Sequence, residues 1–217
     1  MRNVQHSFVI VACFIAGCED GDSAPDSLAV DATSSADSAS DAPGIELPMI
    51  PDAEDLDPQE NAVRISLIAD ELERSVAGQS FAGFGYNGMS PGPTIRANVG
   101  DTVTVEFVNM LEESTTVHWH GLSVPNAMDG AAWIDAPVPA EAGFTYQFVV
   151  DHPGTYWYHP HMDVSRQVDL GLYGAIVVSS PDEPAPDHDI VLMLDAWAEY
   201  DENDPDHHQL PPDPETV

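Results

Sequence analysis

The chain has 217 residues, and 38 acidic against 5 basic residues give it a formal net charge of −33 at pH 7. No lysine occurs and the arginines are scattered, so a nucleic-acid partner is excluded, because nothing would neutralise the phosphates. Of the acidic residues, 13 lie in residues 19–60, 13 in residues 61–180 and 12 in residues 181–217, which sum to 38. The negative charge is therefore concentrated on either side of the middle of the chain.

Residues 1–18 have the layout of an export signal, with Arg2, an apolar run over residues 8–16 and small residues before Cys18. That run is too short for a permanent membrane span. Residues 15–18 resemble a bacterial lipobox, in which cleavage leaves the cysteine lipidated. We therefore expect export to the bacterial cell envelope (periplasm) with a lipid anchor at Cys18; the alternative is an ordinary signal peptide or a short anchor. No other thiol than Cys13 and Cys18 exists.

Residues 19–60 are rich in Asp, Ser, Ala and Pro and contain almost no aromatic residues. Such a composition cannot bury enough apolar surface to offset the entropy of ordering the chain. The sequence therefore predicts an acidic disordered linker between the export signal and the first folded domain.

Residues 61–180 are predicted to form one all-β domain. Short alternating or β-branched runs recur between turn-forming Gly, Pro, Asn and Asp, and only residues 164–170 favour a short helix. Regularly spaced short strands indicate a sandwich or barrel, and about 120 residues is an ordinary domain size. The expected strands are residues 63–69, 81–86, 102–109, 115–119, 144–150, 155–158 and 175–178.

Residues 181–217 are interpreted as a linker and the incomplete start of a second domain. Prolines interrupt the pattern at residues 179–186, and residues 189–197 then predict one buried strand. A single strand cannot bury both of its faces alone. We therefore expect the chain to stop inside this second domain.

Two His-x-His pairs carry the chemical information, namely His118-Trp119-His120 and His159-Pro160-His161. Residues i and i+2 of a strand project from the same face, so two neighbouring strands would aim four imidazoles at one space. Imidazole binds copper, zinc, iron and nickel, so the pattern predicts a metal site. The alternative, isolated core or surface histidines, is disfavoured because both pairs lie in aromatic, strand-like segments. Of the other histidines, His6 falls in the export signal, His152 and His188 lie in turn-like segments, and the pair at residues 207–208 is interpreted as part of a solvated acidic loop rather than a loose metal site.

With its flanking segments, this pattern resembles the first cupredoxin domain of a bacterial multicopper oxidase over about residues 60–200. The order and spacing of several segments carry the resemblance. They are residues 90–96 (SPGPTIR), 99–105 (VGDTVTV), 108–109 (VN), 118–122 (HWHGL), 128–130 (MDG), 154–161 (GTYWYHPH) and 171–174 (GLYG).

The resemblance implies a Greek-key cupredoxin-like β-sandwich, followed by the first strand of a second cupredoxin domain. It further implies the N-terminal part of an exported multicopper oxidase, which couples one-electron oxidation of phenols, other reductants or Cu(I) to four-electron reduction of O2 to water. The chain would supply half of the ligands of a trinuclear copper cluster. A further C-terminal cupredoxin domain would complete the cluster and hold the type 1 copper. Two-domain and three-domain architectures both stay open.

By the same resemblance, His118 would bind the type 2 copper, His120 and His159 one type 3 copper, and His161 the other. Trp119 and Pro160 would pack or stiffen the strands without taking part in the chemistry. Asp129 would relay protons to the cluster, since O2 reduction consumes protons. The competing interpretation of Asp129 is a turn residue that caps its own backbone.

Half of a trinuclear site cannot reduce O2, so these 217 residues alone are expected to be inactive as an oxidase. The alternative function is a non-catalytic copper-binding cupredoxin lipoprotein for copper storage or delivery. A third possibility is a relative that kept the fold and lost catalysis, which the presence of all four histidines opposes.

Overall fold

The computed structural model describes residues 6–12, 49–76, 79–131, 136–184 and 188–195. The chain divides into two units, one formed by Met1–Cys13 with Met49–Val217 and the other by Phe14–Pro48. The second unit, with most of the predicted linker and Cys18, lies outside the described residues. In the part of the chain that is described, no helix has the length and apolar character needed to cross a membrane.

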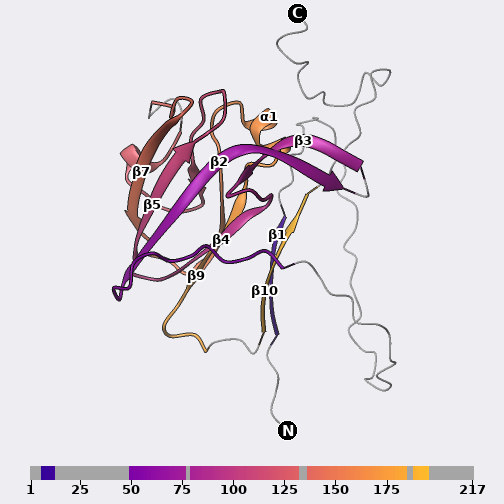
Figure 1. Ribbon diagram of the computed structural model, residues 1–217. Coiled ribbons are helices and arrows are strands. Elements are labelled where there is room, and N and C mark those ends of the chain that lie inside the picture. The colour runs from indigo at the N-terminus through magenta and orange to yellow at the C-terminus, as the bar shows by residue number, and fades with distance from the viewer. Residues whose placement is uncertain (1–5, 13–48, 77–78, 132–135, 185–187, 196–217) are drawn as a thin grey trace, which may run out of the picture. The chain divides into compact units, whose positions relative to one another are not determined.

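Two four-stranded sheets in the first unit form a sandwich, and the expected all-β sandwich is confirmed (Figure 1). Among the described residues, the helical elements are η1 (Asn126–Met128) and α1 (Val164–Asp169). From β3 to β8 the chain alternates between the two sheets, so neighbouring strands in the sequence face each other across the core. In spatial order, one sheet contains β3 (Gln79–Tyr86), β2 (Ala62–Val76), β5 (Thr102–Asn109) and β7 (Ala142–Val149), and the other contains β4 (Gly92–Asn98), β9 (Gly174–Ser179), β8 (Gly154–His159) and β6 (His118–His120).

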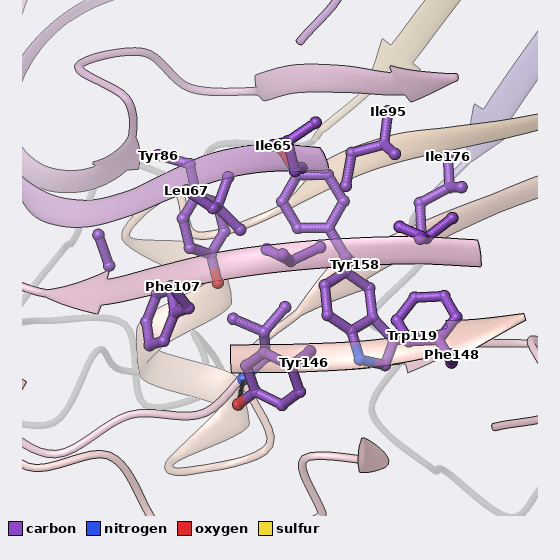
Figure 2. Close-up of a cluster of buried hydrophobic side chains, with 14 of the residues drawn as sticks. Ile65, Leu67, Tyr86, Ile95, Phe107, Trp119, Tyr146, Phe148, Tyr158 and Ile176 are labelled. Carbon is purple, nitrogen blue, oxygen red and sulfur yellow. Dashed lines mark hydrogen bonds between the residues drawn. The ribbon is translucent and has the colours of Figure 1, made fainter. Parts of the chain in front are cut away.

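The core lies between the sheets and is rich in aromatic side chains. In Figure 2 the rings of Trp119, Phe148, Tyr146 and Tyr158 point toward one another from strands of both sheets. Trp119 is fully buried, its ring centroid lies 4.9 Å from that of Phe148, and its indole N–H donates to the carbonyl of Met128 at 2.9 Å. The residue between the first two histidines therefore points into the core, as expected from the two-residue period of a strand.

Most of the expected strands are present, with two instructive differences. β2 runs on to Val76 instead of ending at residue 69, because Ala69 is where its parallel pairing with β5 stops and its antiparallel pairing with β3 begins. Residues 115–117 do not belong to β6. Thr115 forms an isolated bridge with Val138, and the backbone N–H of Val117 donates to the Tyr146 hydroxyl at 3.0 Å.

β10 (His188–Leu194) occupies the predicted start of the second domain, and residues 196–217 lie outside the described part of the chain. Within the strand predicted at residues 189–197, Val191 is buried against β9, whereas Leu194 is 56% exposed. In the described part of the chain, β10 pairs with β1 (His6–Ala12) in a two-stranded parallel sheet. β1 falls within the predicted export signal, which stays a prediction.

Adjacent residues on β7 offer a test of the core. We expect Phe148→Ala to lower the free energy of unfolding by about 3–5 kcal/mol, because it removes a buried ring that packs on Trp119. Val149, next in the strand, is 51% exposed, and Val149→Ala should cost less than about 1 kcal/mol. Urea denaturation of both variants measures the difference. Equal losses of unfolding free energy in the two variants would contradict the assignment of Phe148 to the core and of Val149 to the surface.

Candidate metal centre

Antiparallel pairing of β6 with β8 brings the two His-x-His pairs together. The register sets His118 opposite His159 and His120 opposite Trp157. The ring centroid of His118 lies 5.7 Å from that of His120, 5.4 Å from that of His159 and 5.0 Å from that of His161. The structure thus gathers all four predicted imidazoles around one space.

Three of these rings present their nitrogens closely enough to share one ion. One ring nitrogen from each of His118, His120 and His159 lies within 4.8 Å of the other two. The closest pair is Nδ1 of His120 and Nε2 of His159, 3.2 Å apart. His161 lies outside this trio, although its ring is a direct neighbour of the His118 ring.

His118 is oriented by the loop that contains Asp129. Its Nδ1 lies 2.8 Å from the backbone carbonyl of Asp129 and therefore carries the proton in that hydrogen bond, which leaves Nε2 as the free ligand atom. The Asp129 carboxylate is also close, with Oδ2 3.6 Å from Nδ1. Gly130 follows with φ +68°, and a Cβ there would meet the Val117 carbonyl oxygen at 2.0 Å.

His159 is the most buried of the four imidazoles. Its Nδ1 lies 2.8 Å from the carbonyl of Pro160, and its ring is stacked on Trp157 with the centroids 3.9 Å apart and the planes at 23°. The ring centroid of the same indole lies 5.1 Å from that of His120. Trp157 therefore restrains one ligand ring from each strand.

Burial favours the neutral form of three of the rings, those of His120, His159 and His161. Burial lowers the pKa of His159 to about 3. Burial, followed by the neighbouring imidazoles, also lowers the pKa of His120 and of His161. A neutral imidazole is the form that binds a metal, so protons compete weakly for these sites at neutral pH.

The residues fit a metal with imidazole ligands. The donor set is made only of imidazole nitrogens, and two rings have their second nitrogen fixed by a backbone carbonyl. Such outer hydrogen bonds are typical of histidines that bind metals. The first pair lies in β6, and the second begins at His159, the last residue of β8. Copper, zinc, nickel and iron all accept this donor set.

Sequence reasoning singled out the four histidines and Asp129 as candidates but not the residues that contact them. Trp157 lies between Tyr156 and Tyr158 in an aromatic run, and only the β6–β8 register shows that it faces the metal side. Thr116 accepts a hydrogen bond from the backbone N–H of His161 at 2.9 Å. Its position two residues before His118 was the one available signal, because it places both side chains on the same side of an extended chain.

Together the sandwich and its cluster of four imidazoles define a metal-binding cupredoxin-type domain. Residues 70–183 match the family model described as multicopper oxidase, which covers more than half of the chain. The chain belongs to the multicopper oxidase family, and this membership implies copper as the metal.

Named relatives agree with this assignment. The chain is 45% identical to the multicopper oxidase MmcO of Mycobacterium tuberculosis over 115 residues, covering 52% of this chain and 22% of the relative. It is 38% identical to copper resistance protein A of Pseudomonas syringae pv. tomato over 135 residues, covering 60% and 22%. To L-ascorbate oxidase of Cucurbita maxima it is 43% identical over 126 residues, covering 52% and 21%. The chain thus spans about a fifth of the length of these relatives.

A solved structure supports the same conclusion. The multicopper oxidase from Campylobacter jejuni, described as a metallo-oxidase, superimposes with a TM-score of 0.58 at 33% identity. The match covers 63% of this chain and 30% of that protein. The similarity therefore concerns one domain of a larger oxidase.

Gly130 tests the loop that orients His118. We expect Gly130→Ala to weaken Cu(II) binding by about tenfold, because the added methyl group displaces the Asp129 loop from Val117. Gly88→Ala is the matched control, since Gly88 also has a positive φ (+73°) but nothing within 4 Å of the added Cβ. Isothermal titration of the metal-free chain measures both variants. If the two lose affinity equally, backbone strain alone is responsible.

The low pKa of His159 predicts a pH-dependent stability of the metal-free chain. Its folded pKa lies below the ordinary value of 6.5, so the unfolded chain binds the extra proton first, and stability falls as the pH drops below 6.5. His159→Gln removes this proton-binding site while keeping a neutral polar side chain. Between pH 7 and pH 5 we expect the stability of the wild type to fall by about 1–2 kcal/mol relative to this variant, as measured by urea denaturation. If the free energy of unfolding changes with pH in the same way in both proteins, the low pKa of His159 is contradicted.

Proposed function

We propose that this chain is the N-terminal part of an exported multicopper oxidase and supplies half of the ligands of its trinuclear copper cluster. The observation that carries the proposal is the convergence of His118, His120, His159 and His161 on paired strands. Family membership over residues 70–183 supports it. In this proposal the protein oxidises phenols, other reductants or Cu(I), and O2 is reduced to water in a four-electron reaction.

The proposed division of ligands follows the resemblance. His120 and His159 would bind one type 3 copper, and the 3.2 Å approach of their nitrogens favours a shared ion. His161 would bind the other type 3 copper, consistent with its position outside the close trio. His118 would bind the type 2 copper through Nε2, since its Nδ1 is engaged by Asp129.

The chain's own residues supply positioning and protons. Copper held by the four histidines would supply the electron-transfer chemistry that O2 reduction needs. The carbonyls of Asp129 and Pro160 fix two ligand rings, and Trp157 restrains the His159 plane. The Asp129 carboxylate is partly exposed beside His118, so it can take a proton from solvent and release it toward the cluster.

The C-terminal cupredoxin domain that completes the cluster, and the type 1 copper, would come from the remainder of the protein. Export to the periplasm with a lipid anchor at Cys18 is part of the proposal, supported by the sequence of residues 1–18. The 217 residues alone are expected to bind copper without oxidase turnover.

Copper binding tests the site in this chain. We expect loss of affinity when any of the four histidines is changed to alanine, because each removes one ligand. His152→Ala is the control, since its side chain is 75% exposed and pairs only with Asp151 among the described residues. Equilibrium titration with Cu(II) measures the affinity and stoichiometry. Unchanged binding in all four variants would reject the site.

The oxidase activity is tested in the product of the complete reading frame. We expect O2 uptake with a phenolic reductant, and Asp129→Asn should lower the turnover by about 100-fold while the copper content is kept, because Asn cannot carry the proton. The variant retains the backbone carbonyl that holds His118. Asp163→Asn, at an exposed position with no side-chain cap bond, is the control. Copper loading without O2 uptake in the wild type would support copper storage or delivery instead.

A further inference from the structure

A buried polar network outside the four ligands connects the two His-x-His motifs. It is formed by the segment before β6 and by α1, and the side chains named below include no histidine. Thr115 and Gln167 are each at most 1% exposed, and the Thr115 hydroxyl donates to Gln167 Oε1 at 2.7 Å. The Gln167 amide in turn donates to Glu113 Oε1 at 2.7 Å and to the Ser114 carbonyl at 3.1 Å.

The network reaches the metal site through Thr116. This residue is 1% exposed, and its hydroxyl oxygen accepts the backbone N–H of His161 at 2.9 Å. His161 lies beyond the β6–β8 ladder, which ends at His159, and Pro160 between them has no N–H to donate. The bond from His161 to Thr116 thus extends the connection between the two motifs past the end of the strands.

The two segments are therefore connected at a second point, through α1. α1 begins at Val164, three residues after His161, and its Gln167 returns to Thr115, which is covalently joined to Thr116. Arg166, next to Gln167, forms an ion pair with Glu113 and braces the same helix against the same segment. Because each polar group in this network has a partner, it holds a defined geometry at low cost of desolvation.

We propose that Thr116 is a positioning residue that sets the distance of His161 from the other three imidazoles. This inference rests on the metal site proposed above and assigns a role to a residue that binds no metal itself. His118, His120 and His159 lie within the β6–β8 ladder, whereas His161 lies beyond it and its backbone N–H is bound by the Thr116 side chain from the segment before β6. Loss of the hydroxyl should therefore affect the contribution of His161 selectively.

The test compares Thr116→Val, which removes the hydroxyl but keeps the shape, with Thr116→Ser, which keeps the hydroxyl. We expect Val to weaken Cu(II) binding by about tenfold and Ser to retain the wild-type affinity, since such outer hydrogen bonds carry effects of that size. Thr104→Val is the matched control, because Thr104 is also buried and accepts a bond from Gln147 at 3.1 Å, but in the other sheet. It should bind copper normally.

A double-mutant cycle separates positioning from general destabilisation. In the His161→Ala background, Thr116→Val should cause no further loss of Cu(II) affinity if Thr116 acts through His161. Amide hydrogen exchange should also accelerate at His161 in the single Thr116→Val variant and stay unchanged at the ladder residue Tyr158. Additive losses, or a normal affinity of Thr116→Val, overturn the inference.

The outcomes distinguish this inference from the proposed function. A wild-type chain that binds no Cu(II) rejects the metal site itself, whereas a wild type that binds and a Thr116→Val variant that binds equally reject only the role of Thr116. If Thr116→Val does not fold, the comparison of Thr116→Ser with Thr116→Ala takes its place, with the same expected difference in affinity.

Discussion

The register between β6 and β8 is the constraint on which the site depends. A shift by one residue would turn every side chain of one strand to the opposite face, so Trp119 would leave the core and the imidazoles would separate. The register is fixed from both faces. Trp119 packs on Phe148 inside the sandwich, and Trp157 stacks on His159 on the metal side. Core packing and ligand geometry are therefore set by the same pairing.

The site also shows how backbone and side chains share one task. The Asp129 and Pro160 carbonyls orient two rings without any demand on residue type at those positions beyond the local turn. The Thr116 hydroxyl, in contrast, depends on one side chain. Burial in the same region favours neutral imidazoles, so the fold that orients the ligands also keeps them ready to bind.

The strands and the four histidines were predictable because each depends on a local period that the sequence displays directly. β5 was predicted with the bounds it has, since Val103, Val105 and Phe107 alternate with outward residues. Residues 115–117 were not, because Thr115 pairs with Val138 in an isolated bridge, the backbone N–H of Val117 donates to the Tyr146 hydroxyl on β7, and the Thr116 hydroxyl accepts from the backbone N–H of His161. Trp157, Thr116 and Gln167 were missed for the same reason: their roles arise from contacts between segments that are distant in sequence. The extent of β2 beyond Ala69 likewise depends on a second partner strand.

β6 lies at the edge of its sheet and is only three residues long. Long exposed edges offer a row of free N–H and C=O groups to which strands of other molecules can add, and short edges offer little. The strand that carries two of the imidazoles is thus a poor template for aggregation. A brief edge strand leaves this side of the sandwich open to a metal while limiting unwanted association between copies of the chain.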